Sequence, residues 1–232
     1  MILRAENISK RYFRSSQSAN YFWAVQPLRV EIAPGTVTVL VGRSGSGKTT
    51  LMHMLSGLLA PTEGKVYLDD TDLYALEDEA LSRLRNRRLG VVPQGRSALD
   101  TLTVEENILL PQCLYGRPTG DAAEAWMEKL GILALKNEKP AALSGGELRR
   151  MAIARAAALG PDVIFADEPT GDLDDENTAL VLSSFRTLAD EGRAVFLVTH
   201  ETDALRYADR AFRMEAGAMT EIRPADEQNT DQ

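Results

Sequence analysis

Three mostly apolar runs rich in β-branched residues mark the chain, at residues 36–41, 163–166 and 194–199. Runs of this length and composition are typical of strands buried on both faces of a parallel sheet. Shorter runs at residues 89–92 and 211–214 predict two further strands. The pattern therefore predicts a buried sheet whose strands come from widely separated parts of the chain.

Between these strands, apolar residues recur at helical spacing. The helices predicted in this way cover residues 50–59, 73–88, 104–110, 121–130, 147–159 and 174–191. From about residue 95 to residue 159 strand signals fade, so this part is predicted to be a helical insert in an α/β chain. Ahead of residue 41, segments 2–8 and 28–32 alternate loosely between turns, which favours a small antiparallel sheet.

These patterns predict a single domain over residues 1–222. Its core would combine residues 1–94 and 160–222, the antiparallel β subdomain included, and residues 95–159 would form the helical subdomain. Residues 223–232 are rich in Asp, Glu, Gln and Asn and are expected to form a disordered tail.

Composition narrows the classes of partner. The chain has 232 residues, is 44% hydrophobic and carries a net charge of −8, so nonspecific attraction to nucleic acid or to anionic lipid is not expected. A single cysteine, Cys113, excludes an internal disulfide framework and suits a reducing cytosol. No apolar run reaches the length of a membrane span, and residues 1–6 lack a signal-peptide layout. A role at a membrane would require a partner.

The segment Gly42–Thr49, GRSGSGKT, lies between a predicted strand and a predicted helix and fits the phosphate-loop pattern G-x-x-x-x-G-K-[ST]. Its glycines let backbone N–H groups surround phosphate oxygens, and the helix N-terminus adds partial positive charge. Lys48 can reach the β- and γ-phosphates, and the Thr49 hydroxyl can bind Mg²⁺. The alternative, a glycine turn capping a core helix, is disfavoured by the flanking elements. A nucleoside triphosphate is the predicted ligand.

Polar residues end two of the buried strands. The carboxyl ends of parallel strands meet at a ligand crevice, so Asp167 is placed to hold Mg²⁺ and Glu168 to accept a proton from an attacking water. Without the phosphate loop, the simpler interpretation would be that Asp167 and Glu168 are two exposed acids at a strand end. The phosphate loop reverses that preference. His200 follows the third strand; a lone histidine is more often structural, yet here it could contact a γ-phosphate.

The segment Ser144–Glu147 has the spacing of a capping box, in which the serine and the glutamate cap the start of a helix together. Gly145 and Gly146 occupy the first turn, where each costs about 1 kcal/mol relative to alanine. Their presence makes sense if the backbone there approaches something closely. A helix N-terminus with bare N–H groups suits an anion.

Aromatic residues near the N-terminus offer a surface for a nucleotide base. Tyr12 could stack on the base if the antiparallel sheet folds over the phosphate loop, and packing in the core is an equally good interpretation of its spacing. Tyr21, Phe22 and Trp23 compete for the same role.

Taken in order, the motifs resemble those of the nucleotide-binding subunit of an ABC transporter, over residues 2–222. They are GRSGSGKT at 42–49, Gln94 after a strand, LSGGE at 143–147, VIFADE at 163–168, GDLD at 171–174 and His200. LTVEEN at 102–107 and DEPTGDLD at 167–174 resemble the branch with lipoprotein-releasing, macrolide-exporter and cell-division ATPases. The resemblance implies a P-loop NTPase of the ABC ATPase type, with a RecA-like mixed sheet core, an N-terminal antiparallel β subdomain and an inserted α-helical subdomain.

The resemblance also implies a head-to-tail homodimer that holds two ATP molecules, each between the phosphate loop of one subunit and the LSGGE helix of the other. The nucleotide-binding residues would be Tyr12, Gly42, Ser44, Gly45, Ser46, Gly47, Lys48, Thr49 and Thr50 of one subunit, with Ser144, Gly145, Gly146 and Asp174 of its twin. Mg²⁺ would be held by Thr49, Gln94 and Asp167. The catalytic residues would be Lys48, Gln94, Glu168 as general base and His200 as γ-phosphate sensor.

By the same resemblance, the chain would be a transport-coupled ATPase on the cytoplasmic, inner face of the cell membrane. Its helical subdomain would contact a membrane-spanning permease that carries out efflux or extraction, and no nucleic acid would bind. Two alternatives stay open: an ATPase that moves a membrane protein without transporting a substrate, and a soluble ABC ATPase outside transport. The substrate would meet the permease, so these residues do not specify it.

The chain departs from the family pattern at three positions. Glu147 stands where glutamine is usual, and because either residue can cap the helix, activity is expected to survive. Arg43 replaces a proline common in this branch and adds a positive charge near the phosphates. Asp172 replaces the usual asparagine, with no physical account of its effect.

Overall fold

The computed structural model describes residues 3–13, 21–116, 121–171 and 173–224. The predicted polar loop at residues 15–20, Asp172 and the predicted tail beyond residue 224 lie outside these ranges.

Strands of the described residues form two sheets. The first is antiparallel, with the order β2-β1-β4-β5, and the second is mixed, with the order β10-β9-β3-β8-β7-β6. The strands are β1 (Leu3–Phe13), β2 (Tyr21–Ile32), β3 (Val37–Val41), β4 (Glu63–Leu68), β5 (Thr71–Asp72), β6 (Leu89–Val92), β7 (Val163–Asp167), β8 (Ala194–Thr199), β9 (Arg210–Glu215) and β10 (Ala218–Ile222).

In the mixed sheet, β6, β7, β8, β3 and β9 run parallel, and β10 closes one edge as an antiparallel strand. The helices are α1 (Lys48–Leu55), α2 (Asp78–Arg88), α3 (Val104–Leu114), α4 (Ala122–Lys129), α5 (Gly145–Ala157) and α6 (Asp175–Asp190). Short 3₁₀ turns lie at Leu73–Ala75, Leu133–Leu135, Pro140–Ala142 and Asp203–Tyr207.

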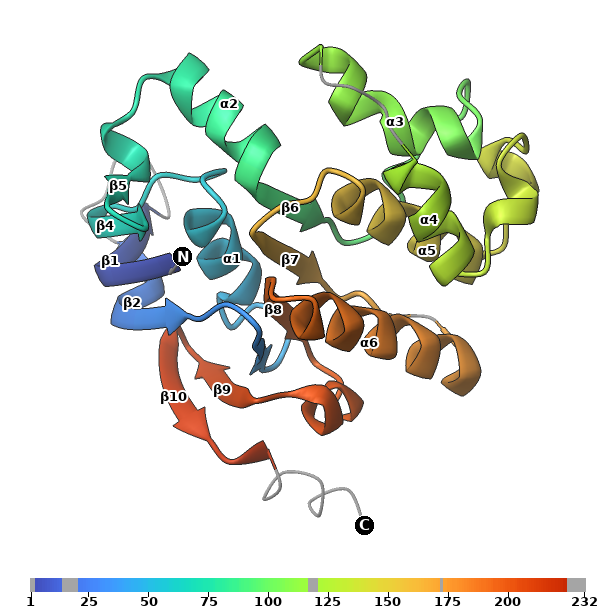
Figure 1. Ribbon diagram of the computed structural model, residues 1–232. Coiled ribbons are helices and arrows are strands. Elements are labelled where there is room, and N and C mark those ends of the chain that lie inside the picture. The colour runs from blue at the N-terminus through green and yellow to red at the C-terminus, as the bar shows by residue number, and fades with distance from the viewer. Residues whose placement is uncertain (1–2, 14–20, 117–120, 172, 225–232) are drawn as a thin grey trace.

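Helix α1 lies between the two sheets (Figure 1). Its apolar face carries Leu51 and Leu55, which pack in one core cluster with Ile8 of β1 and with Phe165 and Phe196 of the mixed sheet. This packing fixes the first turn of α1 at the carboxyl edge of the parallel strands, because α1 follows directly on β3 and the loop between them.

Helix α6 packs on the other face of the mixed sheet. Phe185 and Leu188 share a second core cluster with Val39 and Val195 of the sheet and with Ile153 of α5. Figure 1 shows α3, α4 and α5 grouped together, away from α1 and the antiparallel sheet. These three helices make up most of the segment predicted as a helical insert, and α5 packs against the sheet through Ile153. Within the described residues, no helix is both long and apolar enough to cross a bilayer.

Several predicted elements differ in extent, and for two of them the structure shows the reason. The single helix predicted over residues 73–88 is a 3₁₀ turn followed by α2, since Leu76 and Glu77 are extended. The Tyr74 hydroxyl lies 2.7 Å from the Met54 carbonyl oxygen and 2.6 Å from that of Leu59, which holds the turn against α1. The first strand runs beyond residue 8 to Phe13, because its pairing with β2 continues through irregular register.

Candidate active site

A cleft of about 310 Å³ lies between the phosphate loop and the aromatic ends of β1 and β2. It is lined by Tyr12, Phe22, Trp23, Ala24, Ser44, Gly45, Gly47, Lys48, Thr49, Thr50, Gln94, Glu168, Ala216 and Gly217. A larger adjoining cleft is lined by Gly42, Ser46 and His200, together with Gln94 and Glu168, which line both. Residues from widely separated segments of the chain therefore face the same space.

The loop before α1 has its shape because two of its glycines lie against backbone. A Cβ on Gly42 would lie 2.4 Å from the Met214 carbonyl oxygen, and one on Gly47 would lie 2.0 Å from that of Ala24. Gly47 also has a φ of 110°, in the region that favours glycine. The loop is thus held between β2 and the β9–β10 hairpin, whose Gly217 N–H donates to the Ser46 carbonyl at 3.0 Å.

Lys48, the first residue of α1, is almost fully buried at 6% exposure. Its ammonium group donates to the carbonyl oxygens of Gly42 at 2.6 Å and Arg43 at 3.2 Å, and lies 3.8 Å from Glu168 Oε1. A buried lysine is costly unless it is paired. The ammonium is therefore fixed over the loop, with a carboxylate beside it and room for an anion in the cleft.

Asp167 ends β7 and faces the start of α1. Its Oδ2 accepts the Thr49 hydroxyl hydrogen at 2.8 Å, while its buried Oδ1 has no hydrogen-bond partner among the described residues. Burial raises the pKa of Asp167, and the bond from Thr49 opposes that rise. A buried carboxylate oxygen without a partner is the kind of ligand that a hard cation satisfies.

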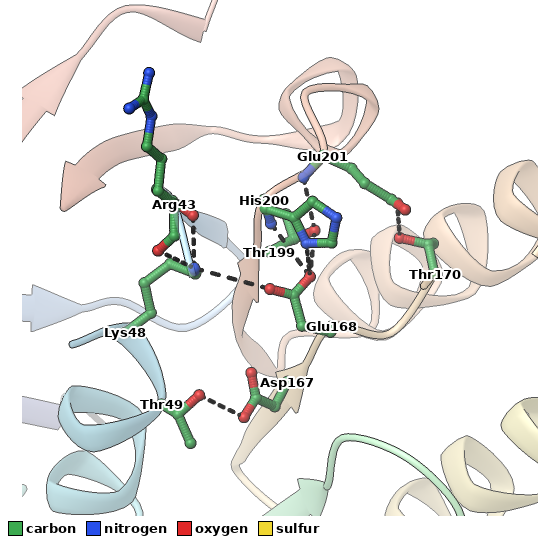
Figure 2. A network of polar contacts seen from close by, with 10 residues as sticks. Arg43, Lys48, Thr49, Asp167, Glu168, Thr170, Thr199, His200 and Glu201 are labelled. Carbon is green, nitrogen blue, oxygen red and sulfur yellow. Dashed lines mark hydrogen bonds and ion pairs between the residues drawn. The ribbon is translucent and has the colours of Figure 1, made fainter. Parts of the chain in front are cut away.

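Glu168 follows β7 with a φ of 46°, a left-handed conformation that is costly for a residue with a side chain. This turn directs its carboxylate toward the end of β8, as Figure 2 shows. There Oε2 accepts from the Thr199 hydroxyl at 3.0 Å and the His200 backbone N–H at 3.2 Å, and lies 2.9 Å from His200 Nδ1. The structure thus places Lys48 beside one oxygen of the Glu168 carboxylate and His200 beside the other.

The sequence did not predict the hydrogen bonds that link Thr199, Glu201 and Thr170 next to Glu168. The Thr199 hydroxyl accepts from the Glu201 backbone N–H at 3.0 Å, and the Glu201 carboxylate accepts from the Thr170 hydroxyl. Thr199 is fully buried in an otherwise apolar strand. A buried polar side chain needs a hydrogen-bond partner, so a threonine in this apolar strand was the signal in the sequence.

The aromatic residues of the first two strands differ in whether they line the cleft. Tyr12 is 38% exposed and lies over the cleft, with its ring 5.9 Å from that of Phe22, so packing in the core is not its role. Trp23 also lines the cleft, whereas Tyr21 does not and packs edge-on against Trp23. Gln94, just after β6, lines both clefts near the phosphate loop.

The tip of α5 has the predicted capping box. Ser144 accepts from the Glu147 N–H, and Glu147 Oε2 accepts from the Ser144 N–H at 2.7 Å and from its hydroxyl at 2.8 Å. The Ser144 N–H first, and then its hydroxyl, lower the pKa of Glu147. Ser144, Gly145, Gly146 and Asp174 line neither cleft at the phosphate loop. One subunit alone does not bring these predicted site residues to the loop.

Two arginines of α5 hold the segment on either side of Gln94. Arg149 donates to the Pro93 carbonyl at 3.0 Å, and Arg155 donates to the Ser97 carbonyl at 2.8 Å and to its hydroxyl. Burial lowers the pKa of Arg155. No motif in the sequence singled out these contacts, which connect the helical insert to the loop that carries Gln94.

Comparison with known proteins decides the family. The ABC transporter family model matches residues 25–171, more than half of the chain. The chain belongs to the ABC transporter family. This ABC ATPase is 39% identical over 219 residues to the lipoprotein-releasing system ATP-binding protein LolD of Aquifex aeolicus (strain VF5), covering 93% of this chain and 95% of that protein. The LolD protein of Pseudomonas syringae pv. tomato is 38% identical over 95% of this chain and 97% of its own length.

Solved structures agree with this assignment. The ABC ATPase matches the dimeric structure of MJ0796, a bacterial ABC transporter cassette, with a TM-score of 0.85 and 31% identity over 95% of this chain and 99% of that one. It matches equally well, at 30% identity, the dimeric post-hydrolysis state of the same cassette bound to ADP and Pi. The predicted fold is confirmed. The chain is the ATP-binding cassette of an ABC transporter and hydrolyses ATP to ADP and phosphate.

Proposed function

We propose that the cleft at the phosphate loop binds ATP with its phosphates over Gly45, Gly47, Lys48 and the first turn of α1. The Lys48 ammonium, now bonded to loop carbonyls, would turn to the β- and γ-phosphates, and Thr50 would add a donor at the helix N-terminus. Tyr12 would stack on adenine at the far end of the cleft, where it is partly exposed. Gly42, Ser44 and Ser46 would shape the loop.

The residues present fit Mg²⁺. Asp167 offers a buried oxygen without a partner, and the Thr49 hydroxyl lies 2.8 Å from the other carboxylate oxygen. Thr49, Gln94 and Asp167 would hold the ion, directly or through water. Within the described part of the chain no group of three or more His, Cys, Asp and Glu could hold a metal, and Mg²⁺ shared with substrate phosphates needs no such group. When bound, the ion would neutralise charge on the β- and γ-phosphates.

Glu168 would act as the general base. Its Oε1 lies 3.8 Å from the Lys48 ammonium, whereas its Oε2 is held by Thr199 and His200. The oriented carboxylate would accept a proton from the attacking water, while His200 would turn its imidazole from Glu168 to the γ-phosphate. Gln94 would help to position the water.

The observation that carries the proposal is the separation of the two halves of the site. The cleft holds the phosphate loop and the base, but the anion-binding helix tip at Ser144–Gly146 and the exposed Asp174 lie outside it. A second copy, placed head to tail by a two-fold axis, would bring its own Ser144 and Asp174 to the nucleotide. Two ATP molecules would then close one dimer.

A groove between α1, α2 and the end of α3 would receive a helix of the membrane-spanning permease. It is lined by Ser56, Leu58, Ser82, Arg85, Asn86, Leu89, Val91 and Tyr115. Leu58 and Tyr115 are 49% and 45% exposed, an apolar surface at the junction of the helical insert and the core. The chain would thus lie at the inner, cytoplasmic face of the cell membrane.

The relatives named above are ATP-binding proteins of lipoprotein-releasing systems, so the proposed transport is extraction of a lipid-bearing protein or a related efflux. The permease would contact that substrate, and closure of the ATP dimer would change the conformation of the permease.

The concentration dependence of ATP hydrolysis tests the proposal. Well below the dimer dissociation constant, the rate should rise with the square of protein concentration, because each active centre needs two chains. Ser144→Arg should abolish hydrolysis while ATP binding persists. A rate that stays first order at all concentrations and survives Ser144→Arg would refute the shared site. Leu58→Asp should lose capture of the permease in membranes, while Leu180→Asp on exposed α6 surface should keep it.

A further inference from the structure

Asn177, in the first turn of α6, occupies a position that no motif of the sequence singles out. Its backbone N–H donates to Asp174 Oδ1 at 2.8 Å, and its side-chain Nδ2 lies 2.9 Å from both carboxylate oxygens of Asp174. These bonds, the backbone one first, lower the pKa of Asp174. The Asp174 carboxylate is therefore oriented from two sides by one residue.

The other end of the Asn177 amide reaches α5. Its Oδ1 accepts a hydrogen bond from Arg150 Nη1, although α5 belongs to the helical insert and α6 to the core. The same oxygen lies 3.0 Å from where a Cβ on Gly146 would be. Gly146 thus lacks a side chain at the point where Asn177 crosses the tip of α5.

We propose that Asn177 is a positioning residue that couples the Ser144–Gly146 tip of α5 to Asp174, so that both cross-dimer contacts of one subunit are presented together. The inference rests on the proposed head-to-tail dimer. The amide suits this role because it donates to a carboxylate and accepts from a guanidinium at the same time. A carboxylate or a hydrocarbon at this position could not do both.

The coupling is measurable as non-additivity of two substitutions. Ser144→Ala and Asp174→Ser, the latter chosen because serine keeps a capping oxygen, are made singly and together in the Glu168→Gln background. The dimer dissociation constant in ATP is then measured by analytical ultracentrifugation. With Asn177 present, the dissociation constant of the double variant should differ by about tenfold from the value obtained by multiplying the two single effects. In the Asn177→Ala protein, the measured and the multiplied dissociation constants should agree to within about twofold.

Two further variants make the test specific. The Asn177→Asp side chain can still accept from Arg150 but cannot donate to Asp174, so this variant should also abolish the coupling, and it preserves side-chain size if Asn177→Ala fails to fold. Ser183→Ala, on exposed α6 surface, should leave the tenfold difference intact. Undiminished coupling in both Asn177 variants would overturn the inference. Failure of Glu168→Gln alone to dimerise with ATP would instead overturn the proposed function, and the inference with it.

Discussion

The hydroxyl of Thr199 donates to Glu168 across 3.0 Å, joining the ends of two neighbouring parallel strands. The same hydroxyl accepts from the Glu201 N–H, so it can orient only toward the carboxylate. The proposed base is thus held by a fully buried group on the adjacent strand, and the strained turn at Glu168 brings the carboxylate within its reach.

Replacement of Glu168 by glutamine should remove proton acceptance while leaving the shape of the site. The amide oxygen can still accept from Thr199, so the fold and ATP binding should be kept. Turnover should fall by about 10²–10⁴, because that is the usual contribution of a general base. Phosphate release and ATP affinity, measured on the same sample, check this. A variant with unchanged turnover would exclude Glu168 as the base.

Thr199→Val should lower both the stability and the turnover of the protein, and the two effects can be measured separately. Valine keeps the shape but leaves the Glu201 N–H without its acceptor, so the free energy of unfolding should fall by about 1–3 kcal/mol. Glu168 would lose an orienting bond, and turnover should fall by up to about 10²-fold in the folded protein. Urea unfolding and ATPase rates measure the two effects.

The control for Thr199→Val is Thr220→Val, at an exposed position of β10. It makes the same chemical change without the two hydrogen bonds and should alter neither quantity. Full turnover in a destabilised Thr199→Val protein would mean that the hydroxyl supports only the fold.

Glu147→Gln should strengthen ATP-driven dimerisation. The amide oxygen can replace the carboxylate oxygen that accepts from Ser144, but the negative charge at the helix tip disappears. A charge at a helix end contributes about 0.3–1 kcal/mol to the free energy of interaction there, so the dimer dissociation constant should fall about two- to fivefold. The effect should be smaller at high salt, because salt screens the charge. Glu128→Gln, exposed on α4, is the matched control. Weaker dimerisation of Glu147→Gln would show that the carboxylate supports closure.

Local patterns determined much of the fold in advance. The buried strands and the capped start of α5 follow from residues close together in sequence, so hydrophobic periodicity and the Ser144–Glu147 spacing were sufficient. Asp167 and Glu168 were found for a similar reason, since the end of a parallel strand marks the ligand edge. The boundary between Ala75 and Asp78 was missed because Tyr74 bonds to the carbonyls of Met54 in α1 and of Leu59 after it, a tertiary contact that periodicity does not record.

Contacts between distant segments account for the other misses. Thr199 and Glu168 are 31 positions apart, and Arg155 and Ser97 are 58 apart. Asn177 has no distinctive pattern, since an asparagine in the first turn of a helix is common and its link to Arg150 exists only once α5 and α6 meet. Side-chain pairing across elements requires the fold before it can be seen.

Tyr12→Ala tests whether the cleft binds a base by stacking. Tyr12 is partly exposed over the cleft, and removal of an aromatic base platform costs about 1–3 kcal/mol, so the ATP dissociation constant should rise about 5- to 150-fold. The rate at saturating ATP should change little, because stacking is equal in the ground and transition states. Competition by inorganic triphosphate, which lacks a base, should be unaffected.

Phe13 provides the matched control for Tyr12. It is the next residue of β1, is 71% exposed and does not line the cleft, so Phe13→Ala removes a ring from the same strand without touching the proposed base site. Its ATP affinity should equal that of the unaltered protein. Equal losses in both variants would indicate that the aromatic rings support the edge of the antiparallel sheet. A loss of triphosphate binding in Tyr12→Ala would place the defect at the phosphate loop, which Gly47 joins to β2 through its contact with Ala24.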